Sequence, residues 1–199
     1  MPYSNTAITR TVPNHDVKAL LGDLAIWFFI FMELAVFGIF FCVYAYTRST
    51  HLELFHQYQL SLNQSIGFTN TLLLITSSYF FVNAVTAIRQ DEEKQCIRWL
   101  SWGILLGIFF LILKSYEFHE KFSQGISLDT NTFYMFYLSL TMFHQFHVAL
   151  GVVIMIAILW NTKNHRYDSD NHTGIETGAV YWHMVDLVWI ILFPLVYIL

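Results

Sequence analysis

Charged residues are scarce in this chain. They make up 12% of its 199 residues, about half of the share that soluble domains average. Hydrophobic residues make up 56% of the chain and aromatic residues 18%, and the mean hydropathy is +0.50. This composition excludes a soluble globular domain and indicates an integral membrane protein.

Cysteine and familiar catalytic motifs are also lacking. The two cysteines, Cys42 and Cys96, form neither a CxxC motif nor a metal-ligand spacing, which argues against thiol chemistry. No stripe of basic residues is present, so nucleic acid is not an expected partner. Walker-type, GxSxG, HExxH and EF-hand patterns do not occur. The sequence therefore lacks the usual signs of nucleotide, hydrolase and calcium sites.

Five apolar stretches are each close to or above the roughly 20 residues that a helix needs to cross a bilayer. The expected spans are 24–46, 66–88, 97–116, 132–161 and 177–199. At 1.5 Å per residue the fourth would reach about 45 Å, so we expect it to tilt or to project beyond the hydrocarbon. The sequence predicts an all-α integral membrane protein, a single bundle of five transmembrane helices over 24–199 that follows a polar arm over 1–23.

Lysine and arginine indicate how this bundle is oriented. If the N-terminus is cytoplasmic, the inner segments hold Arg10, Lys18, Arg89, Lys94, Arg98, Lys163 and Arg166. The outer segments then hold Arg48, Lys114 and Lys121. Because cytoplasmic segments carry an excess of lysine and arginine, we expect a cytoplasmic N-terminal arm and an external Leu199.

Five ionisable side chains lie deep inside the expected spans: Glu33, His144, His147, His183 and Asp186. An ionisable group inside hydrocarbon costs several kcal/mol, so it is rare and by default marks a functional site. His144 and His147 are three residues apart and share a helix face, as do His183 and Asp186. Glu33 and Asp186 each lie about 13 Å from the cytoplasmic end of their span. Both carboxylates should therefore turn inward, with the imidazoles of the fourth span as natural partners.

Glu33 favours a role beyond packing. Glutamine or serine would serve as a structural acceptor at a lower desolvation cost, whereas a carboxylate in hydrocarbon more often handles protons or holds a lipid. We expect its carboxyl group to lie within hydrogen-bond reach of His147. For His183 and Asp186 a structural polar network, whose bonds average about 0.6 kcal/mol in membranes, is an equally good interpretation.

Metal or haem ligation is the alternative use for the histidines. His144 and His147 are too close on one helix to flank a haem, and His183 and His147 differ in depth, at about 9 Å against 21 Å. We therefore expect no metal or haem at these residues. The loop segments 51–56 (HLELFH) and 165–172 (HRYDSDNH) could bind a metal only weakly, and 91–95 (DEEKQ) is predicted to be a solvated turn.

Lys114 and Glu117 lie three residues apart near the outer end of the third span. We expect them to form an ion pair of small energy at the end of the helix. Arg98 and Lys114, near the two ends of this span, should reach outward to the interface.

The spans, taken in order, resemble subunit III of the haem–copper respiratory oxidases, the cytochrome c oxidase subunit III family. The matching segments are WFFIFMELAVFGIFFCVYAY in the first span, NTLLLITSS at 70–78 in the second, KSYEFH at the end of the third, FHQFHV in the fourth and YWHMVDLVWIILFPLVY in the fifth.

This resemblance implies a non-catalytic accessory subunit that binds no haem or copper itself. It would pack against catalytic subunit I, which holds the redox centres, and contact phospholipid. The family's intramembrane carboxylate, associated with lipid contact and sustained proton uptake, corresponds to Glu33. The family's residues in the last two spans correspond to His144, His147, His183 and Asp186. The resemblance leaves Asn70, Lys114 and Glu117 in the expected structural polar network.

The family's long form has seven helices in two bundles with lipids in the cleft between them, so five spans would need another subunit to complete such a cleft. The short form occurs in bacterial quinol and cytochrome c oxidases, which implies the bacterial cytoplasmic membrane. It also occurs in a protein associated with nitric oxide reductase, to which 51–78 is the more similar. Two further hypotheses are a haem b electron carrier and an independent proton or small-ion carrier, the latter disfavoured because no internal repeat is present.

Overall fold

The computed structural model describes residues 14–169 and 171–199, with side chains from Ile26 onward. The elements are α1 (Asn14–Thr50), α2 (Leu52–Gln59), α3 (Gln64–Arg89), α4 (Glu93–Ser123), α5 (Thr132–Lys163), α6 (Thr173–Phe193) and a π-helical turn η1 (Pro194–Ile198). Within these residues, five helices are long and apolar enough to cross a membrane. The predicted all-α fold with five spans is confirmed, and the chain is a multi-pass membrane protein.

Three differences between the observed and the expected helix boundaries affect the argument. α1 begins at Asn14, so the boundary expected at residue 23 falls inside a helix. The segment 51–56 is not a loop, because most of it belongs to α2, whose Phe55 ring is buried against Tyr44 and Phe133. α4 continues to Ser123, about two turns beyond the expected end at residue 116, and this extension changes the environment of the charged residues near that end.

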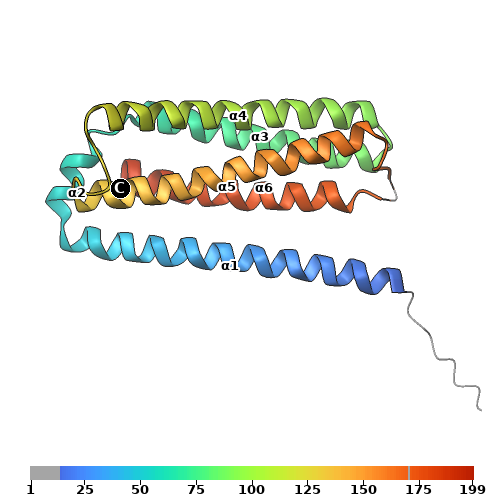
Figure 1. Ribbon diagram of the computed structural model, residues 1–199, viewed down its shortest axis with the longest axis horizontal. Coiled ribbons are helices and arrows are strands. Elements are labelled where there is room, and N and C mark those ends of the chain that lie inside the picture. The colour runs from blue at the N-terminus through green and yellow to red at the C-terminus, as the bar shows by residue number, and fades with distance from the viewer. Residues whose placement is uncertain (1–13, 170) are drawn as a thin grey trace, which may run out of the picture.

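The long helices lie side by side, with α1 along one flank of the group formed by α3, α4, α5 and α6 (Figure 1). In the most apolar part of each span, 61% of the residues are buried in the last span, Thr173–Ile198, but only 11% in Ile26–Thr50. α6 is therefore the central helix, and α1 is a peripheral helix whose side chains pack on α5, α6 and α2.

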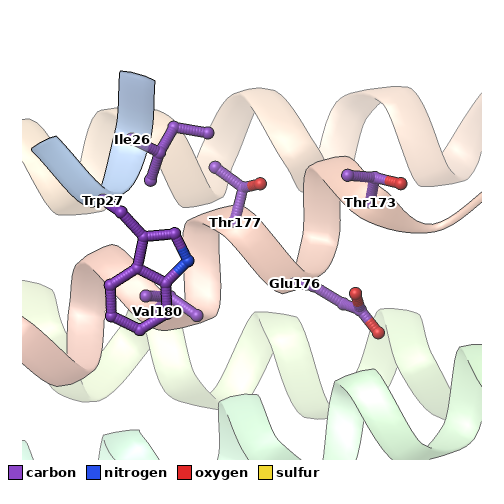
Figure 2. A pocket seen from close by; sticks show the side chains of 6 residues that line it. All are labelled: Ile26, Trp27, Thr173, Glu176, Thr177 and Val180. Atoms are coloured by element: carbon purple, nitrogen blue, oxygen red, sulfur yellow. The ribbon is translucent and has the colours of Figure 1, made fainter. Parts of the chain in front are cut away.

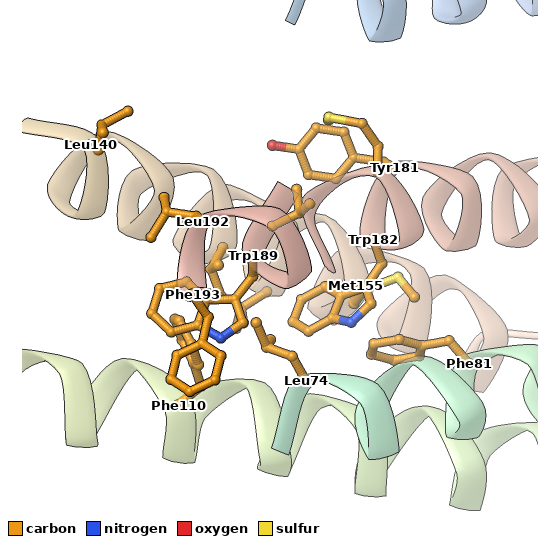
Figure 3. Close-up of a cluster of buried hydrophobic side chains, with 14 of the residues drawn as sticks. Leu74, Phe81, Phe110, Leu140, Met155, Tyr181, Trp182, Trp189, Leu192 and Phe193 are labelled. Carbon is orange, nitrogen blue, oxygen red and sulfur yellow. The ribbon is translucent and has the colours of Figure 1, made fainter. Parts of the chain in front are cut away.

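Aromatic rings fill the space around α6 (Figure 3). Trp182 meets Phe81 of α3 with ring centroids 4.9 Å apart, and Trp189 meets Phe110 of α4 at 5.0 Å, both edge to face, the arrangement that the ring quadrupole favours. α4 can approach these rings because small residues face them. A Cβ added to Gly107 would lie 2.6 Å from the Trp182 ring, so glycine at this position is a condition of the close packing.

Polar contacts join the two loops at one end of the bundle. The Asp91 carboxylate accepts hydrogen bonds from the backbone N–H and the hydroxyl of Ser169, each at 3.0 Å. Glu93 contacts His165 Nδ1 at 2.8 Å. The prediction of a merely solvated turn at 91–95 was therefore incomplete, because these carboxylates hold the α5–α6 loop against the α3–α4 turn.

Candidate functional site

Glu33 of α1 and His147 of α5 form a direct contact inside the membrane-spanning region. The distance from Glu33 Oε2 to His147 Nε2 is 2.9 Å, as expected from the sequence. On the other side of the ring, His147 Nδ1 lies 2.8 Å from the backbone carbonyl oxygen of Phe143. A carbonyl oxygen can only accept, so Nδ1 carries the ring hydrogen.

This geometry fixes the proton content of the pair. With Nδ1 protonated, Nε2 is either an unprotonated acceptor or the second N–H of an imidazolium. An acceptor facing a bare carboxylate at 2.9 Å would be repulsive, so one proton must lie between Glu33 and His147. Whether that proton resides on the carboxyl group or on the imidazole, the Glu33–His147 pair is neutral as a whole and holds one proton.

The surroundings of the pair are mostly aromatic. The side chains of His147 and Glu33 are 12% and 20% exposed, and the rings of Phe143 and Phe37 lie 4.7 and 5.3 Å from the imidazole, edge to face. Tyr181 of α6 donates to the His147 backbone carbonyl at 3.2 Å. These apolar neighbours lower the local dielectric, which strengthens the hydrogen bond.

His144 does not join this site, although it shares a helix face with His147. It is fully buried, and neither ring nitrogen has a hydrogen-bond partner in the part of the chain that the structure describes. Its ring stacks on Trp189 at 5.1 Å and meets Phe110 at 5.9 Å. The expectation that both imidazoles would serve the carboxylates was wrong for His144, because its ring lies among aromatic rings of α6, α4 and α1, the last being Phe37 at 6.3 Å.

His183 and Asp186 link α6 to α3 instead of pairing with α5. The hydroxyl of Ser78 lies 2.7 Å from His183 Nδ1, and the same serine is a hydrogen-bonding neighbour of Asp186. Asp186 Oδ1 has no partner among the described residues. An imidazole of α5 was therefore the wrong partner to expect for Asp186, and Glu33 and Asp186 belong to separate sites. Asn70 is fully buried, and its amide atoms contact no hydrogen-bonding group in the described chain.

The Lys114 cluster, which consists of Lys114, Glu117, Tyr137 and Tyr197, contains the ion pair that the sequence predicts, but the pair is buried rather than placed at a solvated helix end. Lys114 Nζ lies 3.0 Å from Glu117 Oε2, and the side chains are 0% and 1% exposed. Tyr137 and Tyr197 each donate a 2.7 Å hydrogen bond to Glu117 Oε1, and Lys114 donates to the Tyr197 hydroxyl.

The expected position of this pair at an exposed helix end was wrong because α4 continues to Ser123 and tyrosines from α5 and η1 cover the pair. Lys114 therefore does not reach outward to the interface. The missed signal was the pair of tyrosines, because a buried tyrosine hydroxyl usually needs a polar partner.

A small cavity of about 230 Å³ lies elsewhere, between α1 and the start of α6 (Figure 2). Trp27 and Val180 form its apolar side and Glu176 its polar side. Glu176 is held by Arg89 and by His172 at 3.1 Å. Glu33 lies about two helical turns along α1 from Ile26, about 10 Å away, so this cavity is separate from the Glu33–His147 pair.

The described residues contain no cluster of three or more His, Cys, Asp or Glu side chains that could hold a metal ion. In the loop 165–172, His165 and His172 contact Glu93 and Glu176, while Asp170 lies outside the described residues.

A family model described as cytochrome c oxidase subunit III matches residues 11–199. The chain belongs to this family. It is 32% identical over 186 residues to cytochrome c oxidase subunit 3 of Thermostichus vulcanus, covering 93% of this chain and 89% of the relative. It is 27% identical over 201 residues to cytochrome bo(3) ubiquinol oxidase subunit 3 of Buchnera aphidicola, covering 98% and 96%.

The chain also resembles cytochrome c oxidase subunit 3 of Synechocystis sp., with 36% identity over 131 residues. That match covers 65% of this chain but only 55% of the relative, so the chain spans about half the length of this longer family member. The family resemblance read from the five motifs is confirmed.

Proposed function

We propose that this protein is the accessory subunit III of a haem–copper terminal oxidase in a bacterial cytoplasmic membrane, packed against the catalytic subunit. The observation that carries the proposal is the Glu33–His147 pair, a neutral proton-holding pair inside the membrane, in a chain of the subunit III family. The protein would be part of an oxidoreductase complex without performing the redox reaction.

The chemical role follows from the pair itself. It can hold a proton at a fixed depth in the membrane, and the proton can shift between carboxyl and imidazole without changing the net charge. Such a group would buffer or supply protons beside the catalytic subunit and so sustain turnover. Phospholipid would occupy the grooves that protein does not cover.

Haem and copper would reside in the partner subunit. In this chain His147 uses both ring nitrogens in contacts with Glu33 and Phe143, and His183 uses Nδ1 for Ser78. The ring of His144 is enclosed by aromatic side chains. These contacts support, for each imidazole, a role other than metal ligation.

The electron donor differs among the relatives, because they are named as cytochrome c oxidase and as ubiquinol oxidase subunits. An association with nitric oxide reductase stays a prediction from the 51–78 segment. Purification in mild detergent, followed by an optical spectrum, separates the hypotheses. A co-purifying haem-bearing subunit supports the proposal. A lone colourless chain would favour an ion carrier, and a lone chain with a Soret band would favour a haem b carrier.

Glu33→Gln tests the role of the pair. Glutamine keeps the size and one hydrogen bond but cannot hold the bridging proton, so we expect normal assembly and a normal initial rate, followed by a loss of activity over many turnovers. Glu53→Gln, at an exposed carboxylate of α2, is the matched control and should behave as wild type. If both variants keep their activity over the same number of turnovers, the Glu33–His147 pair has only a packing role.

A further inference from the structure

A groove on the outer surface of the bundle, between α4 and α5, is lined by a polar pair as well as by apolar side chains. The groove has a volume of about 380 Å³, and its apolar lining includes Phe118, Met142 and Phe146. Within this lining, Gln145 Nε2 donates a 2.9 Å hydrogen bond to Ser115 Oγ. We call this feature the Ser115–Gln145 groove.

The hydrogen-bonding capacity of this pair is only partly used. Gln145 Oε1 can accept, and the Ser115 hydroxyl can still donate, yet within the described chain the bond between them is the single hydrogen bond that either side chain makes. One free acceptor, the Gln145 oxygen, and two free donors, the Ser115 hydroxyl and the second N–H of the Gln145 amide, thus lie close together on the bundle surface.

Other hydroxyl groups on the outer surface behave differently. Thr76 donates to the Leu72 carbonyl at 2.7 Å, and Ser101 donates to the Ile97 carbonyl at 2.8 Å. Each is satisfied four residues back on its own helix, which makes it compatible with lipid. Ser115 and Gln145 form a bond across two helices instead and leave complementary groups unsatisfied.

The depth of Gln145 makes water and lipid headgroups poor partners for its free amide groups. Gln145 is 13 residues after the start of α5, about 20 Å along a helix of about 48 Å, so it lies within a few ångströms of the midpoint. The hydrocarbon layer is about 30 Å thick, and acyl chains neither donate nor accept. An unsatisfied amide or hydroxyl group is costly in that medium.

We propose that the Ser115–Gln145 groove is a docking site for a transmembrane helix of another subunit. That helix presents a side chain that both donates and accepts, namely Ser, Thr, Asn or Gln, at the depth of Gln145. Backbone groups of a transmembrane helix are already used within it, so the contact must come from a side chain. The identity of the partner as an oxidase subunit rests on the proposed function.

Shape argues against a second copy of this chain as the occupant. A symmetric dimer brings the same surface of both copies together, and two concave grooves placed face to face would leave an empty space between them. A single helix offers a convex ridge instead. Two exposed apolar side chains of α5 and α4, Phe146 at 67% and Ile112 at 58% exposure, would pack along the sides of the docked helix.

The test places a photoreactive benzoylphenylalanine at position 146 in the full complex in native membranes. We expect a light-dependent adduct with a transmembrane segment of a different subunit, identified by mass spectrometry. Gln145→Leu should lower the adduct yield about threefold or more, because the loss of one interhelical hydrogen bond in a membrane changes an association constant by about that factor on average. Thr76→Val, which removes a hydroxyl satisfied within its own helix, is the matched control and should leave the yield unchanged.

Adducts with lipid alone, adducts with a second copy, or an unchanged yield in Gln145→Leu would each overturn the docking site. These results are separable from a failure of the proposed function. If haem-bearing subunits co-purify but position 146 labels lipid, the docking site fails and the function stands. If position 146 labels a helix of a complex that contains no haem, the docking site stands and the proposed function fails.

Discussion

Removing one partner of the buried Lys114–Glu117 pair should lower the thermal stability of the protein by a large and measurable amount. In Glu117→Gln the ammonium group of Lys114 would stay at 0% exposure without its counter-charge, and the two tyrosine hydroxyls would lose a charged acceptor. Breaking a buried pair by removing one partner costs about 3–5 kcal/mol, because it leaves an uncompensated charge. For a protein of this size, that cost corresponds to a fall in melting temperature on the order of 10 °C.

The double variant Lys114→Met/Glu117→Gln separates this effect from a general loss of packing. It removes both charges while keeping similar volumes, and apolar replacement of a whole buried pair is often close to neutral. We therefore expect it to recover most of the loss. Thermal unfolding in detergent, monitored by the fraction of protein that remains monodisperse, gives the comparison.

The exposed Arg89–Glu176 pair supplies the matched control. The Arg89 side chain is 59% exposed, so Glu176→Gln should cost about 1 kcal/mol or less. If Glu117→Gln is as mild as Glu176→Gln, or if the double variant is no better than the single one, the uncompensated-charge argument is refuted.

Three further outcomes are expected. Gly107→Ala should destabilise the bundle by about 1–3 kcal/mol through overpacking against Trp182, whereas Gly38→Ala, whose added Cβ would meet no described atom within 4 Å, should be neutral in the same thermal assay. His144→Leu should lower the melting temperature only slightly, since no hydrogen bond within the described chain is lost; a fall as large as that of Glu117→Gln would reveal a polar partner of the imidazole. A reporter fused after Leu199 should be active only outside the cytoplasm, and cytoplasmic activity would reverse the orientation inferred from lysine and arginine.

The sequence predicts the spans well because apolar length decides membrane insertion with little help from tertiary contacts. It also predicts the Glu33–His147 contact, since a carboxylate in hydrocarbon requires a partner at its own depth. In both cases the deciding free energy, that of apolar insertion or of carboxylate desolvation, belongs to the residues themselves and does not depend on how the helices pack.

The environments of Lys114 and His144 were not predictable in the same way. Lys114 is buried because Tyr137 and Tyr197, 23 and 83 residues away in sequence, close over it, and this depends on how helices rotate against one another. His144 and His147 differ by three positions, yet the first lies among aromatic rings and only the second meets a carboxylate. Helical spacing places both on one side, but the rotation of α5 decides which neighbour each side chain meets.

The attachment of α1 has a consequence for how the protein responds to its surroundings. Among the described side chains of α1, the bond from Glu33 to His147 is the one hydrogen bond that reaches another helix, and the span itself is sparsely buried. The Glu33–His147 bond thus helps to hold α1 in place, together with the buried rings of Phe37 and Tyr44, which pack on α5. By reciprocity of linked equilibria, whatever presses α1 onto the bundle favours the Glu33–His147 contact, and whatever breaks that contact loosens the helix. The state of one intramembrane side-chain pair and the docking of a transmembrane segment are therefore coupled.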